Sequence, residues 1–349
     1  MKNSAFLRAC KQKEVDYTPI WLMRQAGRYI PEYRKIRKTH GVMEICKDPE
    51  LSSDVSAMPI NMFGLDAAII FEDLMVPLEP TGIKFSLVDK VGPVIENTIK
   101  DMSDIENMAE YNIEEVGFVA DAIKLLKDKV DVPVIGFAGG PFTMACYMID
   151  GIHNKKFKKT LWMVENRPEI FNMLMGRLTN IVIRYLELQV RAGADAIQLF
   201  DTWCGILDKK KYHEFVMPHS QKIFKSVAAM DSSVPKIHFA LNSSGILKDI
   251  AQLGCDVVSV DWRNDIDRIW PQIGYSKAIQ GNLDPSILVG GGKHMTDSAI
   301  EILERVDGRK GHIFNLGHGI LPDTKPENVR KLVDVVHNYD IRGRYVNSS

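Results

Sequence analysis

The sequence contains no long apolar run and no excess of charge of either sign. None of its apolar segments approaches the roughly 18 uncharged residues that a membrane-spanning helix needs. Its start, MKNSAFLRACKQKEVDY, lacks the continuous apolar stretch of a secretion signal. The formal net charge is −1, whereas a nucleic-acid-binding domain carries a basic stripe or a high pI. We therefore expect a cytoplasmic protein with neither a membrane nor a nucleic acid as its partner.

Cysteine is also scarce. The five cysteines are scattered and form no CxxC pair, which argues against a disulfide framework and against a cysteine-rich metal site. The histidines show no HExxH spacing, and the GGGK segment at 290–293 lacks the spacing of a P-loop. We therefore expect neither a metal nor a bound cofactor. The cysteines lie at Cys10, Cys46, Cys146, Cys204 and Cys255.

Eight short apolar runs recur along the chain, and segments with helical periodicity separate them. The runs are nearly continuous rather than alternating, which is typical of parallel strands buried on both faces. Helices are expected at Asp121–Lys129, Arg177–Arg191 and Ile246–Leu253. The pattern favours an α/β fold with one domain spanning residues 1–349, namely a single (β/α)8 TIM-type barrel. An open doubly wound sheet is the alternative, but no GxGxxG follows the first run. The runs are Pro19–Met23, Asp66–Phe71, Val132–Phe137, Ala194–Phe200, Lys236–Ala240, Val257–Val260, Lys277–Ile279 and His312–Asn315.

Residues suited to chemistry follow nearly every run. The runs end in MRQAGR, FED, FAGGPFT, FDTW, VDW, GNLDP and NLGHG. The active site of a β/α barrel lies at the C-terminal ends of the strands, so a deep cleft is expected at that edge. The gap between Phe71 and Val132 exceeds what one crossover needs, which predicts a hairpin or lid around Val76–Pro93.

Two arginines follow the first run directly. Arg24 and Arg28 flank Gly27, which permits close approach of the backbone. A guanidinium is permanently charged and binds a carboxylate through two hydrogen bonds. The pair therefore indicates a substrate with several carboxylates or phosphates. For the basic residues at positions 34–38, a solvated basic helix is favoured.

Asp73 ends the second run, directly after Glu72. We expect one of these carboxylates to face the mouth of the barrel and the other to face outward. An acid at a strand end can act as a general acid, a metal ligand or an acceptor for N–H donors. It is also a common helix N-cap, and the spacing alone leaves the functional and the capping interpretations equally open.

Three further polar side chains stand at expected strand ends. Tyr147 lies in the helix that follows the turn GGP at 139–141, where a half-buried core tyrosine is the favoured interpretation of the pattern alone. Thr202 follows Asp201 and offers a hydroxyl group. His318 is flanked by glycines, and it can bind an anion when protonated or donate a hydrogen bond when neutral.

The strand-end motifs together resemble the uroporphyrinogen decarboxylase family. The motifs MRQAGRYxPEYR, DAAIIFxD, GFAGxPFTxxxYM, QLFDxW, VDW, QGNLDP and NLGHG occur in the family's order, from about Thr18 to His337. The resemblance implies a barrel that forms a homodimer. It also implies that four acetate groups of uroporphyrinogen III are lost as CO2 without a cofactor, giving coproporphyrinogen III in the porphyrin and heme pathway.

By motif match, the resemblance assigns catalysis to Asp73, Arg24 and Arg28. The implied substrate contacts are Arg24, Gln25, Ala26, Gly27, Arg28, Asp73, Tyr147, Thr202 and His318. Two departures stand out: DTWCG replaces the usual DSWAG, and NSSG follows the fifth run where a KGxG-like segment is expected. Threonine keeps the hydroxyl, whereas the second departure puts the local contacts there in doubt.

Two other functions are compatible with such a barrel. A zinc-dependent corrinoid methyltransferase uses His-x-Cys after the fifth strand and a second cysteine near the end. Here those positions read His238-Phe239-Ala240 and Gly317-His318-Gly319, so both thiolates are missing. A non-catalytic tetrapyrrole binder is the other alternative, and a turnover assay separates it from an enzyme.

Overall fold

Seven strands form one parallel sheet at the centre of the fold. The computed structural model describes residues 4–88, 91–152 and 156–341. Every residue of the second and fourth strands in the sheet is buried, which explains why the runs lack alternation. Seven of the eight predicted runs are thus confirmed as strands. In sheet order they are β1 (Ala68–Ile69), β4 (Val134–Gly139), β5 (Ala196–Phe200), β6 (Lys236–Phe239), β7 (Val257–Ser259), β8 (Ala278–Gln280) and β9 (His312–Ile313).

The first predicted run, Pro19–Met23, forms an isolated parallel bridge between Ile20 and Phe314 instead of a longer ladder. Phe314 N donates to Pro19 O at 2.8 Å, and on the other side Asp66 N donates to Ile20 O at 2.9 Å. Ile20 N in turn donates to the Asp66 carboxylate at 2.7 Å. A side chain therefore replaces the backbone partner that would extend the ladder, and the segment contacts both edges of the sheet.

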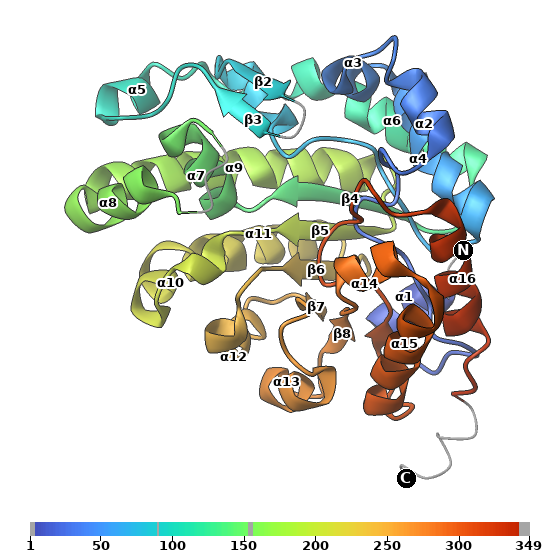
Figure 1. The fold of residues 1–349 in the computed structure, drawn as a ribbon. Helices are drawn as coiled ribbons and strands as arrows, with labels where there is room; N and C mark the ends of the chain where they lie inside the picture. Colours follow the sequence, from blue (N-terminus) through green and yellow to red (C-terminus); the bar gives the residue numbers. More distant parts are fainter. Residues whose placement is uncertain (1–3, 89–90, 153–155, 342–349) are drawn as a thin grey trace.

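The helices lie outside the sheet, and Figure 1 shows the strands from β4 to β8 side by side within them. The predicted helices Asp121–Lys129 and Arg177–Arg191 are confirmed within longer ones, whereas the helix predicted for Ile246–Leu253 ends at Ile250. Among the described residues, no helix is both long and apolar enough to cross a membrane. The α-helices are α1 (Ala5–Cys10), α2 (Pro31–Ile36), α3 (Val42–Lys47), α4 (Pro49–Phe63), α5 (Met102–Glu106), α6 (Phe118–Lys129), α7 (Pro141–Asp150), α8 (Lys158–Asn166), α9 (Pro168–Arg191), α10 (Lys209–Phe215), α11 (Met217–Met230), α12 (Leu247–Ile250), α13 (Ile266–Ile273), α14 (Pro285–Gly290), α15 (Gly292–Val306) and α16 (Pro326–His337), and the 3-10 helices are η1 (Val76–Thr81), η2 (Ile113–Val116), η3 (Cys204–Ile206) and η4 (Ser244–Ile246).

The long insertion after β1 contains the predicted hairpin. Strands β2 (Phe85–Val88) and β3 (Gly92–Ile95) pair antiparallel. Ile95 N donates to Gly151 O at 2.7 Å, so the hairpin is joined to the end of α7, and Figure 1 shows β3 above this helix. The prediction of a hairpin is confirmed, and the insertion lies beside the helix that carries Tyr147.

A chain of buried side-chain hydrogen bonds crosses the sheet. Trp21 Nε1 donates to Gln280 Oε1 at 2.8 Å. Gln280 Nε2 donates to Gln198 Oε1 at 3.1 Å and to Ser259 Oγ at 2.9 Å. Since buried polar groups are costly without partners, these contacts fix the first segment relative to β5, β7 and β8.

Asp66 joins the N-terminal segment, the sheet edge and the C-terminal helix. Besides Ile20 N, its carboxylate accepts from Tyr17 Oη at 2.8 Å and contacts His337 Nε2 of α16 at 2.8 Å. We predict that Asp66→Ala lowers the free energy of unfolding by about 2–4 kcal/mol, because it removes several hydrogen bonds to a charged group. Urea denaturation measures the change.

The matched control is Asp54→Ala, since the side chain of Asp54 is 59% exposed and its ion pair among the described residues is with Lys129. Its loss should change the free energy of unfolding by about 1 kcal/mol or less. Equal destabilisation by the two substitutions would contradict the role assigned to Asp66.

Candidate active site

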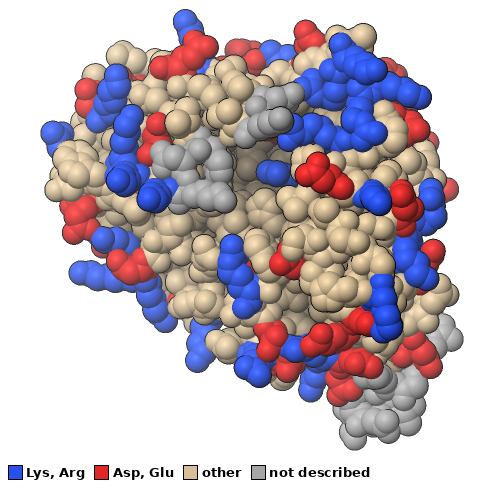
Figure 2. All heavy atoms as spheres, viewed as in Figure 1, with Lys and Arg blue, Asp and Glu red and all other residues tan. Residues whose placement is uncertain are grey.

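The segments that follow the strands lie together at one end of the sheet, because parallel strands all have their C-terminal ends on the same side. Figure 2 shows a hollow near the middle of the view, with basic side chains beside it. The predicted residues come to this end from five places in the chain: after the Ile20 bridge, after β1, in α7, after β5 and after β9.

Arg24 has a left-handed backbone (φ 61°), which is uncommon for a residue other than glycine. The turn is held by Gln25, whose buried amide donates to Ala67 O at 3.0 Å and accepts from Leu22 N at 3.2 Å. The side chain of Gln25 therefore fixes the arginine loop to β1. The motif match predicts Gln25 as a substrate contact, and nothing in the motif distinguishes a substrate contact from this role in holding the loop.

The arginine loop packs against the NLGHG segment after β9. An ideal Cβ atom on Gly319 would lie 2.4 Å from Cδ of Arg24, so glycine leaves the space that the arginine stem occupies. His318 is half-buried, and its ring lies 6.1 Å from that of Phe239 and 6.5 Å from that of Trp262. The two aromatic neighbours were not predicted as site residues, although VDW was noted as a strand-end motif.

Arg28 is exposed, and the backbone at this position is held by a second arginine. Arg34, on α2, donates to Arg28 O at 2.9 Å and to Tyr29 O at 3.1 Å. Arg34 is exposed on α2, in line with the interpretation of positions 34–38 as a solvated basic helix, and its guanidinium also satisfies two carbonyl groups of the preceding loop. Figure 2 shows basic side chains gathered over the region where α2 and α3 lie in Figure 1.

Asp73 lies in the loop between β1 and η1. Its Oδ1 accepts from Met75 N at 2.9 Å, so one carboxylate oxygen closes a turn. Met75, not Asp73, is the residue that caps η1, and the N-cap interpretation is thus replaced by a turn with a similar contact. Burial raises the pKa of Asp73, while the Met75 N–H and the charge of Arg24 oppose the rise.

The loop that carries Asp73 is held by hydrogen bonds to the helices α4 and α9. Glu72 accepts from Tyr185 Oη of α9 at 2.6 Å, and burial raises its pKa well above the usual range. Ser52 Oγ donates to Phe71 O at 2.8 Å, and Phe71 N donates to Ser56 Oγ at 2.7 Å. Glu72 therefore faces the helix layer, in line with the expectation that the two adjacent acids diverge.

Tyr147 lies in the second half of α7 and is buried. Its hydroxyl accepts a hydrogen bond from Trp203 Nε1 at 3.2 Å. Burial raises the pKa of Tyr147, and the negative charge of Asp73 adds to this rise, whereas Trp203 and the positive charge of Arg24 oppose it. Tyr147, Asp73 and Arg24 thus lie within electrostatic reach of one another, which the sequence did not predict without the family resemblance.

Thr202 is half-exposed after β5, and its carbonyl accepts from Leu241 N at 3.1 Å. Gly205, in η3, packs against the loop after β6, since a Cβ atom on Gly205 would lie 2.0 Å from Leu241 O. The unusual NSSG segment begins with Asn242 in a left-handed conformation (φ 53°), and its N–H donates to Asp261 at 2.6 Å. The departure from the family pattern therefore forms an ordered turn beside Thr202.

One group of buried side chains has the donor types of a metal site. Ligand atoms of Asp201, Cys204 and His238 lie within 4.8 Å of one another, and carboxylate, thiolate and imidazole are zinc ligands. Asp201 Oδ2 and both His238 nitrogens lack hydrogen-bond partners within the described part of the chain. Burial raises the pKa of Asp201 to about 6 and lowers that of His238 to about 3. The expected absence of a metal stays a prediction, and this group is where an ion could bind.

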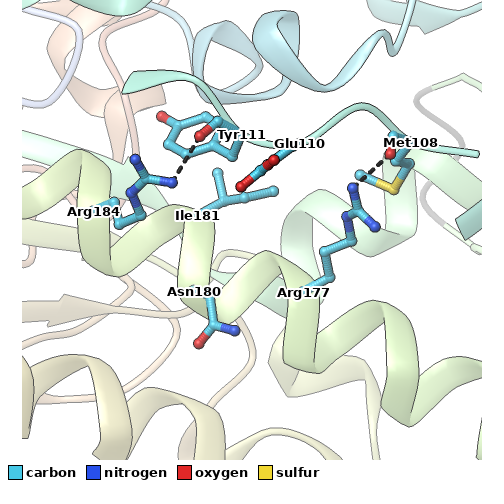
Figure 3. A pocket seen from close by; sticks show the side chains of 7 residues that line it. All are labelled: Met108, Glu110, Tyr111, Arg177, Asn180, Ile181 and Arg184. Atoms are coloured by element: carbon cyan, nitrogen blue, oxygen red, sulfur yellow. Dashed lines mark hydrogen bonds between the residues drawn. The ribbon is translucent and has the colours of Figure 1, made fainter. Parts of the chain in front are cut away.

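A surface pocket of about 390 Å³ lies elsewhere, between α9 and the segment before η2. Figure 3 shows Arg177 and Arg184 beside it. Arg177 donates to the carbonyls of Ile105 and Met108 at 3.1 and 2.6 Å, and Arg184 donates to Tyr111 O at 2.7 Å. These arginines hold the backbone of the insertion to α9, so we assign the pocket no part in the candidate site.

Known proteins give the arrangement its context. A solved methyltransferase from Methanosarcina mazei has a TM-score of 0.81 at 25% identity, covering 95% of this chain and 96% of that one. A uroporphyrinogen decarboxylase of Sorangium cellulosum is 44% identical over 339 residues, which is 96% of each chain. Another, from Chloroflexus aggregans, is 44% identical over 340 residues with the same coverage. Residues 1–339 match the family model described as uroporphyrinogen decarboxylase (URO-D), and the chain therefore belongs to the uroporphyrinogen decarboxylase family.

Proposed function

We propose that this protein converts uroporphyrinogen III to coproporphyrinogen III by removing four acetate carboxyl groups as CO2. The single observation that carries the proposal is the electrostatic grouping of Asp73, Arg24 and Tyr147 at the strand ends of a chain in a decarboxylase family. When CO2 leaves, the electron pair of the broken C–C bond stays behind and needs an electron sink. A pyrrole ring can itself be that sink, so we propose that no cofactor takes part.

The proposed reaction has two proton additions and one proton release for each acetate. A proton first adds to the ring carbon beside the acetate and makes a ring cation. The bond to the carboxylate then breaks, its electron pair flows into the ring, and CO2 leaves. A second proton adds to the exocyclic carbon while the first is released, so the net change is R–CH2–COO⁻ + H⁺ → R–CH3 + CO2.

The site residues suit this sequence of charges. Arg24, Arg28 and His318 bind substrate carboxylates, and Thr202 and Tyr147 offer hydroxyl groups. Asp73 accepts pyrrole N–H groups and stabilises the ring cation, because a preorganised charge in a water-poor site is a large catalytic contribution. The substrate's N–H groups act in the same direction as the Met75 N–H and Arg24, which already favour the ionised form of Asp73.

The same proposal extends to the architecture. The segment Pro19–Met23 would act as the eighth strand of a closed (β/α)8 barrel, a single domain with a deep cleft at the strand ends. The Ile20 hydrogen bonds to both sheet edges support this closure. We also expect a cytoplasmic homodimer with facing clefts. Val88, the last residue of β2, and Ile152, which bridges to Val94 of β3, are 43% and 46% exposed, and these apolar side chains would suit a protein contact.

A methyltransferase is the second candidate. The fold similarity to the Methanosarcina mazei protein favours it, as does the group formed by Asp201, Cys204 and His238. The positions of both expected thiolates are occupied by Ala240 and by the glycines beside His318. Identity of 44% to decarboxylases against 25% to this methyltransferase favours decarboxylation.

Chelation separates the two candidates. We predict that the purified protein still releases CO2 from uroporphyrinogen III after EDTA treatment and exhaustive dialysis, because the proposed chemistry uses only side chains and the substrate's own ring. Activity that disappears on chelation and returns with zinc would favour the metal-dependent function.

The charge of Asp73 is tested by Asp73→Asn. The amide still accepts from Met75 N, so the turn is kept, but the negative charge is lost. We predict that kcat falls by about 10²-fold or more, that substrate binding weakens less, and that Asp73→Glu retains more activity than Asp73→Asn. Single-turnover CO2 release and substrate titration measure these effects.

Asp48→Asn is the matched control, since Asp48 accepts from Glu50 N and Leu51 N at the start of α4. Asparagine caps about as well as aspartate, so this variant should be as active as the unaltered protein. A nearly normal kcat for Asp73→Asn as well would reduce Asp73 to a turn residue.

Arg28→Lys tests the two-pronged contact with a carboxylate. It keeps the charge and loses the planar fork, and we predict a fall in kcat/KM of about tenfold or more. Arg191→Lys, an exposed position at the end of α9, is the control and should have little effect. Arg34 is unsuitable as a control because it holds the Arg28 carbonyl. Equal kcat/KM values for the two lysine variants would remove Arg28 from the substrate contacts.

A further inference from the structure

A buried group of three side chains lies where β5 ends beside β6. The group consists of Asp201, Cys204 and His238, whose ligand atoms lie within 4.8 Å of one another, and all three side chains are fully buried. Leu199 of β5 is paired with His238 in register, and Asp201 lies two residues further on, so it points to the same face of the sheet. Cys204 N donates to Asp201 O at 3.2 Å, and this turn brings the thiol to the same place.

The polar atoms of this group lack the partners that buried polar atoms normally have. Asp201 Oδ1 accepts from Thr143 N at 3.2 Å and from Thr143 Oγ1 at 2.9 Å, whereas Oδ2 has no hydrogen-bond partner in the described part of the chain. Both ring nitrogens of His238 are unpartnered among the same residues. A buried polar group without a partner costs free energy, and a bound cation would give the carboxylate and the imidazole a partner at once.

The donor types of the group select the cation. Carboxylate oxygen, thiolate sulfur and imidazole nitrogen bind Zn²⁺ with bonds of about 2.0–2.3 Å, whereas Mg²⁺ and Ca²⁺ prefer oxygen ligands. Atoms bound to one tetrahedral ion lie roughly 3.3–3.7 Å apart at these bond lengths, so side-chain shifts of about 1 Å would complete the site. An ionised Asp201 and an ionised Cys204 balance the charge of one divalent cation, and His238 binds as the neutral imidazole.

The surroundings hold the ligands in place. Thr143 binds Asp201 from the first turn of α7, and a ligating carboxylate is commonly held by such a second hydrogen bond. Gly140 leaves space for the same carboxylate, since a Cβ atom there would lie 2.4 Å from Asp201 Cγ. Tyr212 Oη is buried without a partner among the described residues. Burial raises the pKa of Tyr212, and the charges of Cys204 and Asp201 add to the rise, so this hydroxyl lies near enough to support a coordinating atom.

The group faces away from the candidate active site. The ring of His238 lies 6.1 Å from that of Phe224 on α11. Phe239, the next residue of β6, has its ring 6.1 Å from that of His318, which is a candidate substrate contact. Because successive residues of a strand point to opposite faces of the sheet, an ion held by His238 lies on the α11 side and not on the side of His318.

We propose that Asp201, Cys204 and His238 form a structural zinc site that joins the end of β5 to β6. The ion neutralises a buried carboxylate and links the turn after β5 to the neighbouring strand. Sequence motifs did not reveal the site, because its ligands form an Asp-x-x-Cys turn and a lone histidine on the next strand. Since the site and His318 lie on opposite faces, the proposed decarboxylation does not depend on the ion.

Cobalt spectroscopy tests the site. The full-length protein is stripped of metal with a chelator and titrated with Co²⁺, which gives a near-ultraviolet charge-transfer band when a thiolate binds it. We expect one Co²⁺ per chain, its displacement by one Zn²⁺, and a melting temperature several degrees higher with excess Zn²⁺. Because the group is buried, the titration is repeated on protein unfolded and refolded with the ion. Failure to bind in both cases, as expected if the group holds only buried water, would overturn the proposal.

Substitutions identify the ligands. Cys204→Ala should abolish the charge-transfer band, and Cys204→Ser, which keeps the size of the side chain, should do the same if the alanine variant does not fold. His238→Asn should weaken Zn²⁺ binding about 100-fold or more, since the loss of an outer partner alone costs about 10–100-fold. Thr143→Val removes such an outer partner and should weaken binding about tenfold, whereas Thr143→Ser keeps the hydroxyl and should restore it.

The matched control is Cys10→Ala, which removes a buried thiol of α1 and should bind Zn²⁺ as tightly as the unaltered protein. A band and an affinity that persist in the Cys204 and His238 variants would show that the ion binds elsewhere on the chain, and would overturn the proposal. CO2 release from uroporphyrinogen III is measured on the same metal-free samples. A protein that binds Zn²⁺ through these ligands but releases no CO2 would contradict the proposed decarboxylation and support the zinc site.

Discussion

The hydrogen bonds of Ile20 are the contacts on which the arrangement of the site depends. Ile20 bridges to Phe314 on one edge of the sheet and to Asp66 on the other, although the segment is too short to count as a strand. The residues that follow Ile20 therefore start at the same C-terminal end of the sheet as the residues that follow β1 and β9. Without this joint, Arg24 and Asp73 would stand at separate ends of an open sheet.

Each element of the candidate site is fixed by a partner that does no chemistry. Gln25 holds the arginine loop, Gly319 leaves space for the Arg24 stem, and Glu72 binds Tyr185 behind the aspartate. The arrangement has an energetic cost. Because burial raises the pKa of Asp73 above the ordinary value of an aspartate, the stability contributed through this group falls as pH rises from that ordinary value through the raised pKa. An ionised Asp73 thus opposes folding where it serves the proposed reaction.

The sequence predicted most of the frame, because nearly continuous apolar runs and Gly-rich strand ends are local signals. It predicted a strand for Pro19–Met23, where Asp66 replaces the ladder partner, and a longer helix after Ile246. Local patterns could not reveal that Arg34 binds the Arg28 carbonyl or that His238 lies near Asp201. The first contact is close in the chain but depends on the conformation of the arginine loop, and the second joins residues distant in the chain and depends on packing.

For the chosen site residues, motif matching supplied the positions and the structure supplied the partners. Tyr147 looked like a core tyrosine by its pattern, and it is buried, yet its hydroxyl meets Trp203 and lies within the fields of Asp73 and Arg24. The indole of Trp203 was visible only as part of a motif. Its contact with Tyr147 joins two elements distant in the chain, and no spacing in the sequence encodes such a contact.

The central claim is that the Asp73 carboxylate lies against the pyrrole nitrogens. A crystal structure of the protein with coproporphyrinogen III, grown without oxygen, tests it most directly. The account predicts Asp73 carboxylate oxygens within about 2.7–3.2 Å of pyrrole nitrogens, with Arg24 and Arg28 on the side-chain carboxylates. A bound ring whose nitrogens face other groups, with Asp73 contacting only the Met75 N–H, would contradict it.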